Sequence, residues 1–350
     1  MKILYGIQGT GHGHVSRARE LLPELSNYGT IDILLSGYNH NLDVEGNVVY
    51  RKRGLSLIYD QNGSVSIAET VRNLDLVRFI TDVRQLSVSK YDLIISDFEP
   101  VTSWSAYQSS KPCVGISHQA SFYSSKVPRP LRESVLAEKM LEKFAPPSGA
   151  LGFHFRRYDD FIEPPLVRRE VTELSPETGD HITVYLSSYD HQTLVALFEP
   201  ITEIKWEIFS PYCDTPYTKG DHIMVHPIDN KRFLQSLATA RGVISGAGFE
   251  LCSEAMYLEK RLMVIPIANQ YEQLCNATAL AEMGISVVPR INGSFTDTVR
   301  YWVQNSSLVS LPEIADPVKI AKRVVDHIHE IDTESVLYTP NQAGSLKRLF

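Results

Sequence analysis

Cysteine is scarce in this 350-residue chain, and the four that occur stand far apart, as Cys113, Cys213, Cys252 and Cys275. They form no Cys-x-x-Cys pair and have no histidines nearby at metal-ligand spacing, which argues against a zinc ribbon and a disulfide framework. We therefore expect reduced, structural thiols and no bound metal ion.

The chain also lacks long hydrophobic runs and runs of positive charge. No apolar stretch approaches the roughly 20 residues of a membrane span, and Met1 leads directly into a short apolar segment rather than a charged leader. The formal net charge is −7, and no stripe of Lys and Arg could cover a phosphate backbone, which argues against nucleic acid as a partner. The expected location is the cytoplasm, with peripheral contact at the inner face of the membrane left open.

What is present is the composition of a soluble globular protein, 43% hydrophobic and 21% charged, in a chain long enough for two domains. Short apolar strands alternate with helical segments in both halves, which predicts an α/β fold with mostly parallel sheets covered on both faces. Strands are predicted over residues 2–7, 31–35, 91–96, 113–117, 182–186, 206–209, 222–225, 242–245 and 262–265. Helices are predicted over residues 15–25, 102–108, 131–144, 192–198, 231–239 and 317–331, and from residue 249.

The most informative stretch is 242–284, which reads as a strand, a tight turn at Gly246–Gly248, a helix, a second strand and another helix. Backbone N–H groups and the helix dipole at such a turn favour an anion, and a diphosphate would fit there. Glu254 lies in the second turn of that helix, where a carboxylate can accept hydrogen bonds from sugar hydroxyls, as acidic residues do for ribose in other nucleotide folds. Glu272 and Gln273, followed by Asn276 and Ala277, place a carboxylate and an amide side by side, which offers two acceptors and a donor to the hydroxyls of a hexose.

The first strand opens into a second glycine-rich turn, residues 8–14. The dinucleotide fingerprint needs a third glycine where His14 stands, and the second strand ends in Leu35-Ser36-Gly37 without the acidic residue that would hold a ribose. This argues against NAD.

Three polar groups follow strands whose carboxyl ends should share one edge of the first sheet. They are His12 and His14, Asp97 and Glu99, and His118 with Gln119. A histidine and a carboxylate on neighbouring loops can form a dyad in which the Asp fixes the tautomer and the ring accepts a proton from a hydroxyl. His14 is the predicted base, with Asp97 as the orienting or alternative basic group. A His14 that caps the helix or binds phosphate, with an Asp97 that only caps a helix, is the competing interpretation.

At this point the residues resemble a known family. The pattern Ser-x-x-Gly-x5-Glu over residues 245–254, an Ile-Pro strand end, and Glu-Gln-x-x-Asn-Ala over 272–277 are similar to the donor-sugar signature of inverting GT-B glycosyltransferases. The closest comparisons are family 28, whose members include the N-acetylglucosaminyltransferases of lipid-linked peptidoglycan precursors, and the UDP-glycosyltransferases. Gly-Thr-Gly-His-Gly-His-Val at 9–15 and Ser-His-Gln at 117–119 resemble the N-terminal glycine loop and a His-containing segment of the same group.

The resemblance implies two Rossmann-like domains facing each other across a cleft. Residues 1–175 would form the acceptor domain and 180–316 the nucleotide-sugar donor domain, and the helix and tail over 317–350 would cross back to the first. It also implies roles for individual residues. The catalytic residues would be His14 and Asp97, the acceptor-side residues His118 and Gln119, and the donor-binding residues Gly11, Gly13, Ser245, Gly246, Ala247, Gly248, Phe249, Glu254, Glu272 and Gln273.

The implied activity is transfer of a sugar from a nucleotide-sugar, expected to be a UDP-sugar, to a hydroxyl acceptor with inversion. No Asp-x-Asp signature occurs, so no metal or other cofactor is expected. The acceptor is left open between a glycan, a lipid-linked intermediate and a small molecule, in cell-envelope or polysaccharide synthesis. A UDP-N-acetylhexosamine 2-epimerase-like enzyme and a non-catalytic nucleotide-sugar-binding protein are the alternatives.

Three local expectations complete the analysis. Arg17, one helical turn after His14, could face the cleft as an anion contact, but an arginine on a helix is more often solvated, and we expect a solvated side chain. The helix over 131–144 alternates Glu with Lys and Arg, which favours an ordinary surface helix over a lipid-contacting one. The family usually has a Gly-x-Pro turn before its second donor-domain strand, whereas Glu259-Lys260-Arg261 stands here, so the geometry of that turn is not given by the resemblance.

Overall fold

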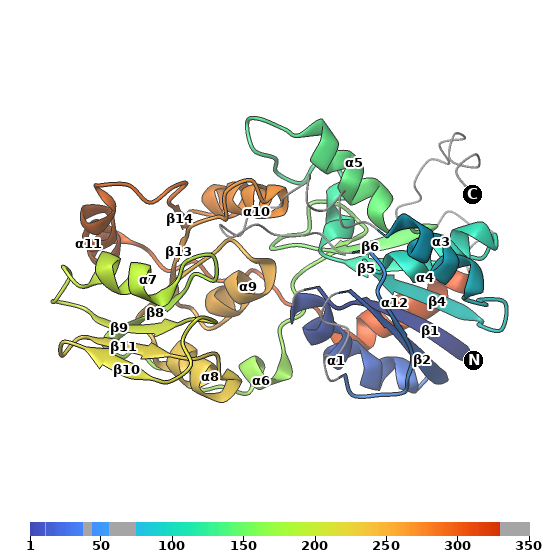
Figure 1. The fold of residues 1–350 in the computed structure, drawn as a ribbon, viewed down its shortest axis with the longest axis horizontal. Helices are drawn as coiled ribbons and strands as arrows, with labels where there is room; N and C mark the ends of the chain where they lie inside the picture. The colour runs from blue at the N-terminus through green and yellow to red at the C-terminus, as the bar shows by residue number, and fades with distance from the viewer. Residues whose placement is uncertain (11, 38–43, 56–74, 330–350) are drawn as a thin grey trace.

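The architecture consists of two α/β halves, each built on its own sheet (Figure 1). The structure is a computed structural model and describes residues 1–10, 12–37, 44–55 and 75–329. Within these residues each half contains a seven-stranded sheet, with strand orders β3-β2-β1-β4-β5-β6-β7 and β10-β11-β9-β8-β12-β13-β14. The first sheet is parallel throughout, and in the second only the edge pair β10–β11 is antiparallel.

The first half carries the elements up to the start of β8. Its strands are β1 (Lys2–Gln8), β2 (Thr30–Ser36), β3 (Val48–Lys52), β4 (Leu93–Asp97), β5 (Val114–Ser117), β6 (Gly149–Phe153) and β7 (Ile162–Glu163). Its helices are α1 (His12–Ser26), α3 (Leu76–Gln85), α4 (Pro100–Gln108), the 3₁₀ helix η1 (Gln119–Tyr123), α5 (Val135–Phe144) and α6 (Arg169–Thr172).

The second half repeats the alternation of strand and helix. Its strands are β8 (His181–Tyr185), β9 (Lys205–Phe209), β10 (Tyr217–Lys219), β11 (Ile223–His226), β12 (Gly242–Ser245), β13 (Arg261–Val264) and β14 (Ser286–Val287). Its helices are α7 (His191–Phe198), α8 (Asn230–Thr239), α9 (Phe249–Tyr257), α10 (Tyr271–Glu282) and α11 (Phe295–Asn305), and α12 (Pro317–His329) ends the described chain.

Both sheets are buried on both faces, as the near-continuous apolar strands predict. In β1 the side chains of Ile3 and Tyr5 belong to one apolar cluster, which includes residues of α1 and α12. Leu4, between them, belongs to a different cluster with residues of α3 and α4. The alternation follows from the two-residue period of a strand, which sends neighbouring side chains to opposite faces.

The strand orders place a switch point in the middle of each sheet. In the first sheet the switch point lies between β1 and β4: the chain adds β2 and β3 on one side of β1, and β4 to β7 on the other side. In the second sheet it lies between β8 and β12, with β9 to β11 on one side and β12 to β14 on the other. In open α/β sheets ligands bind outside the carboxyl ends of the strands at such a point. The loop with His14 and the end of β4 at Asp97 lie at the first switch point, and the turn Gly246–Gly248 lies at the second.

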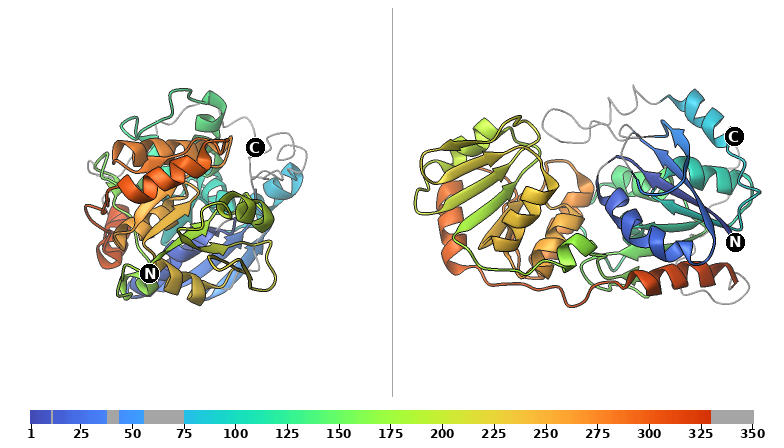
Figure 2. Two further views of the ribbon diagram at one scale, coloured as in Figure 1. Left: turned by 90° about the vertical axis from the view of Figure 1, so that its left-hand side faces the viewer. Right: turned by 90° about the horizontal axis from the view of Figure 1, so that it is seen from below.

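The last described helix returns to the first half. The segment after α11 runs along one side of the molecule, and α12 lies beside α1 (Figure 2). Ile320, Ala321 and Val324 of α12 are buried in the cluster that includes α1. Arg323 forms an ion pair with Glu163 of β7. No helix within the described ranges is long and apolar enough to cross a membrane.

The predicted strands and helices of the glycine-turn units are present in the described residues, whereas the segment between residues 126 and 176 was misjudged. No strand was predicted there, but β6 and β7 lie in this segment and extend the first sheet. Both are short and flanked by prolines, so they give little periodic signal. Residues 56–74 and the predicted tail from residue 330 fall outside the described residues.

The turn between α9 and β13 has the geometry that the family's glycine would give, although Glu259 occupies it. Glu259 has φ 54°, in the left-handed region. Its N–H donates to Met256 O, and the N–H of Lys260 donates to Ala255 O at 2.9 Å. This is a Schellman helix end, in which the left-handed position is usually glycine. Buried Lys260 then donates from Nζ to the carbonyls of Glu177 and Ala238, which anchors the turn.

Glu259→Gly should therefore stabilise the protein, because a non-glycine residue in the left-handed region is strained by about 1–2 kcal/mol. Part of that gain is offset by the greater freedom of glycine in the unfolded chain, so the expected increase in the free energy of unfolding is about 0.5–1 kcal/mol. Chemical denaturation measures it. The matched control is Gln235→Gly, at an exposed position inside α8, which should lose about 1 kcal/mol. Destabilisation in both variants would contradict the prediction.

Candidate functional site

His14 and Asp97 come together at the first switch point. β1 leads through the glycine turn into α1, whose third residue is His14, and Asp97 is the last residue of β4, the strand paired with β1. His14 Nδ1 lies 2.7 Å from Asp97 Oδ1, and both side chains are buried. Arg17 Nη2 approaches the same Nδ1 at 3.2 Å, but the contact with the carboxylate is the shorter one. Because a carboxylate only accepts hydrogen bonds, we assign the proton to Nδ1, which leaves Nε2, on the far side of the ring, as an acceptor.

Arg17 is part of the same cluster, contrary to the expectation that it is solvated. Its Nε donates to Asp97 Oδ2 and its Nη2 to Oδ1, both at 2.8 Å, in the bidentate arrangement typical of Arg–carboxylate pairs. The side chain is only 4% exposed. Its sequence position, one turn after His14, indicates a shared helix face but not the buried carboxylate that faces it.

The ionisation of Asp97 follows from these contacts. Burial alone would raise the pKa of this carboxyl, but the charges and hydrogen bonds of Arg17 and His14 outweigh it and hold the pKa below its ordinary value. Asp97 is therefore a charged orienting group, and the completely buried carboxylate has no access to an acceptor hydroxyl. Between the two alternatives for its role, this geometry favours orientation over direct proton abstraction.

The residues after Asp97 hold the β4 end rigidly. Phe98 has φ 52°, a rare conformation for a bulky residue, and its half-buried ring stacks on Phe144 at a centroid distance of 4.7 Å. Glu99 is the N-cap of α4, and its carboxylate accepts from the N–H groups of Val101 and Thr102. Glu99 is thereby committed to a structural role.

The predicted diphosphate turn lies at the second switch point. Gly248 is the N-cap of α9 and supplies no side-chain hydrogen bond to the first turn of the helix. A Cβ at Gly248 would meet no atom within 4 Å, so there is open space in front of this turn. The N–H of Ala247, however, donates to Gln273 Oε1 at 3.1 Å, and the N–H of Ile267 donates to the same oxygen at 3.0 Å. The structure thus uses Gln273 to brace the turn, a role that differs from the predicted sugar contact.

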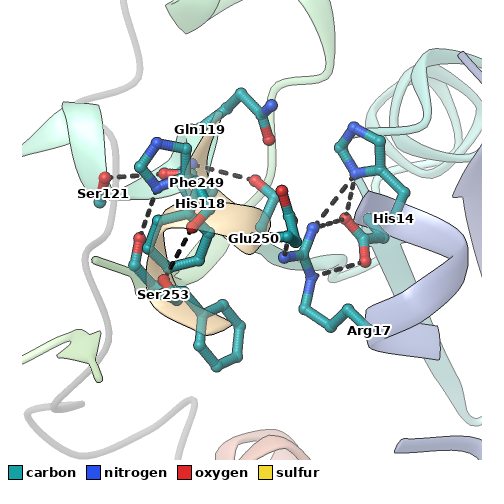
Figure 3. A network of polar contacts seen from close by, with 12 residues as sticks. His14, Arg17, His118, Gln119, Ser121, Phe249, Glu250 and Ser253 are labelled. Atoms are coloured by element: carbon teal, nitrogen blue, oxygen red, sulfur yellow. Dashed lines mark hydrogen bonds and ion pairs between the residues drawn. The ribbon is translucent and has the colours of Figure 1, made fainter. Parts of the chain in front are cut away.

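Glu254 and Glu250 project from α9 toward the first half. Arg168, in the segment between β7 and α6, binds both oxygens of Glu254 at 2.6 and 2.9 Å. Burial raises the pKa of Glu254, and the bonds from Arg168 partly oppose that shift. Glu250 Oε1 lies 3.5 Å from Arg17 Nη1 and so connects α9 to the His14 cluster (Figure 3). A Cβ on Gly13 would overlap the Glu250 carboxylate, so a larger residue there would displace the Glu250 side chain from Arg17.

His118 and Gln119 lie in the contact between the halves rather than on an open acceptor surface. The His118 ring is stacked on Phe249 at 4.1 Å, and its nitrogens lie 2.8 Å from Phe153 O and from Asn276 Oδ1. Burial lowers its pKa to about 4, so the ring is neutral at pH 7. Gln119 Nε2 donates to Glu272 Oε2 at 3.0 Å. The predicted acceptor-side and sugar-binding groups are thus direct neighbours.

A cavity opens between the halves where these elements meet. It is lined from the first half by Gly13, Ser16, Arg17 and residues 165–168, and from the second half by Phe249, Glu250, Ser253 and Glu254. A single ion pair, between Arg17 and Glu250, therefore connects the buried cluster of His14, Asp97 and Arg17 to the N-terminal turn of α9. Across the described ranges, no group of three or more His, Cys, Asp and Glu side chains is arranged to hold a metal ion.

Comparison with known proteins agrees with this architecture. The model of the family described as Glycosyl transferase family 1 matches residues 1–298. The chain belongs to this family. No curated protein sequence matches this glycosyltransferase.

Solved structures show that the glycosyltransferase has the GT-B fold. The glycosyltransferase SnogD from Streptomyces nogalater superposes with a TM-score of 0.58 at 15% identity, covering 93% of this chain and 99% of that one. UGT89C1 from Arabidopsis thaliana, complexed with UDP, gives 0.56 at 12% identity and covers 96% of both chains. MurG from Acinetobacter baumannii gives 0.53 at 12% identity, covering 94% of this chain and 99% of that one. The predicted fold and the resemblance to GT-B glycosyltransferases are both confirmed.

The structure adds site residues that the sequence did not identify. Arg168 is 86 residues from Glu254, and nothing in its local sequence signals that pairing. Asn276, noted in the Glu-Gln-x-x-Asn pattern, links His118 to Ala247 O and so braces the turn. Gly11 lies outside the described residues, and its predicted donor contact remains a prediction.

Asp97→Asn should lower the free energy of unfolding by about 3 kcal/mol at pH 7, because it leaves buried Arg17 with only the more distant carboxylate of Glu250. Because the pKa of Asp97 is lowered in the folded protein, its contribution to the free energy of unfolding is fully present above about pH 4. That contribution is lost as the pH falls through the folded-state pKa. The gap between the two proteins should therefore narrow in acid, as measured by urea unfolding at several pH values. Exposed Asp221→Asn is the control and should change stability by less than about 0.5 kcal/mol. A gap that stays constant on acidification would contradict the assignment.

Proposed function

We propose that this glycosyltransferase transfers a hexose from a UDP-sugar to a hydroxyl acceptor with inversion and without a metal ion. The observation that carries the proposal is the pairing of His14 with Asp97 at one switch point, directly across the domain contact from the N-terminus of α9 at the other. One end of this arrangement can remove a proton and the other can hold a negatively charged leaving group.

The proposed reaction is a single displacement. Nε2 of His14 takes the proton of the acceptor hydroxyl, which makes the ring an imidazolium. Asp97 stabilises this cation through its hydrogen bond with Nδ1. The acceptor oxygen bonds to the anomeric carbon as the bond from that carbon to the diphosphate breaks. Attack from the face opposite the leaving group inverts the anomeric configuration. Arg17 keeps Asp97 ionised and in place throughout.

The first turn of α9 would hold the leaving diphosphate. Its N-cap is a glycine without a capping side chain, the space in front of Gly248 is open, and the helix dipole favours an anion there. These features supply the charge stabilisation that a cation provides in other transferases. Within this proposal Glu254 accepts from the ribose hydroxyls, and Glu272 from the hydroxyls of the transferred sugar. The preference for UDP is supported by the donor signature over residues 245–277 and by the UDP complex of one solved neighbour.

His14→Ala should reduce turnover by roughly 10²–10⁴-fold, the range of a general base, while UDP binding stays nearly unchanged. Turnover is followed as UDP release with a panel of glycan, lipid-linked and phenolic acceptors, and binding by calorimetry. The control is His222→Ala, in the second half and remote from the domain contact, which should keep full turnover. Equal turnover of wild type and His14→Ala would remove His14 from the mechanism.

Chelation should leave turnover unchanged, because the proposed charge stabilisation comes from α9 and not from a cation. The measurement is UDP release before and after extensive dialysis against EDTA. A loss that Mg²⁺ or Mn²⁺ restores would overturn metal independence while leaving the base assignment intact. Incubation with the UDP-sugar alone, followed by product analysis, tests the epimerase alternative, which would convert the donor without any acceptor.

A further inference from the structure

The carboxylate that the proposed function gives to the donor ribose is already paired with a side chain of the protein. Arg168 Nε and Nη2 donate to the two oxygens of Glu254, and the Glu254 side chain is only 5% exposed. The pair joins the two halves, because Arg168 precedes α6 and Glu254 lies in α9. Both residues line the small cavity between the halves, so the ion pair forms part of its wall.

A guanidinium and a ribose present the same hydrogen-bonding pattern to a carboxylate. Two parallel N–H groups of the guanidinium bind the two oxygens side by side. The vicinal 2′- and 3′-hydroxyls of a ribose also offer two neighbouring O–H donors. A carboxylate with little solvent exposure has room for one such partner at a time. The ribose and Arg168 must therefore exchange at Glu254.

Arg168 has other partners that would hold it close by after such an exchange. Its Nη1 lies 3.2 Å from Asn230 Oδ1 and 3.5 Å from Glu170 Oε2. Asn230 Nδ2 in turn donates to Glu170. The guanidinium can therefore leave Glu254 and remain paired with Glu170, so that the released cation still has a counter-charge.

We infer that Arg168 is a built-in competitor of the donor, a ribose mimic that closes the cavity by occupying Glu254 and that the nucleoside diphosphate must displace. This inference rests on the proposed function for the role of Glu254. The inference predicts the direction in which the affinity for the donor changes. Removing Arg168 should tighten donor binding, whereas removing an arginine that contacts the donor would weaken it.

The experiment is calorimetric titration of the full-length protein with UDP, without metal, in wild type, Arg168→Ala, Glu254→Ala and the double variant. Arg168→Ala should lower the Kd for UDP by about tenfold, as expected when a competing state that holds nine-tenths of the molecules is removed. Glu254→Ala should raise the Kd, and adding Arg168→Ala to it should change nothing further. Arg169→Ala removes the same charge from the exposed neighbouring position and should leave the Kd unchanged.

A thermal-unfolding cycle on the same four proteins, without UDP, tests the ion pair independently. Each single variant should lower Tm, and the double variant should lose less than the sum, because the second substitution removes a group already left unpaired. Additive losses would show that the pair does not form and would overturn the inference.

The outcomes separate the inference from the proposed function. Weaker UDP binding by Arg168→Ala would make Arg168 a donor contact and overturn the competition, with the donor class retained. Equal Kd values for wild type and Glu254→Ala would remove Glu254 from the ribose site. If none of the four proteins binds UDP, the proposed function and the donor competition both fail, although the thermal cycle would still establish whether the pair joins the halves.

Discussion

The bidentate pair between Arg17 and Asp97 is the constraint on which the rest of the site depends. It places a cation and an anion at the end of the central strand pair, where neither reaches bulk water. His14 is oriented by the same carboxylate, and Glu250 forms an ion pair with the same guanidinium. One buried pair thus sets the tautomer of the proposed base and also ties α9 of the second half to α1 of the first. A buried pair of this kind tolerates little change, because either member alone would be an uncompensated charge.

The contact between the halves is specific because polar and apolar groups alternate in it. The His118 ring stacks on Phe249, while its two nitrogens face Phe153 and Asn276. Near it, Gln119 reaches Glu272 across the same contact. The apolar core that contains Phe249 also contains strands of both sheets, so the two halves share buried surface. The two switch points are consequently held opposite each other by the same residues that line the proposed substrate sites.

Much of the fold was accessible from the sequence because it is encoded locally. A glycine turn between an apolar strand and a helix identifies itself within about a dozen residues, and both such turns lie where they were predicted. The pairing of His14 with Asp97 was also predictable, since the carboxyl ends of adjacent parallel strands share an edge. β6 and β7 escaped notice because their pairing partners, not their own residues, make them strands. The buried ion pairs of Arg17 and Arg168 were not predicted for a related reason. An arginine is expected to be exposed unless a buried carboxylate lies next to it, and only the tertiary structure shows Asp97 and Glu254 in those positions.

The return of α12 to the first half has a consequence for how the chain folds during synthesis. The apolar face of α1 is completed by residues 317–329, which are made after the whole second half. Emergence of β1 to β7 from the ribosome therefore does not supply all the surface that covers the first sheet. The strands and helices of the second half, by contrast, are contiguous in the chain from β8 to α11. The first half is therefore complete only after α12 has been made, although its own strands and helices are translated first.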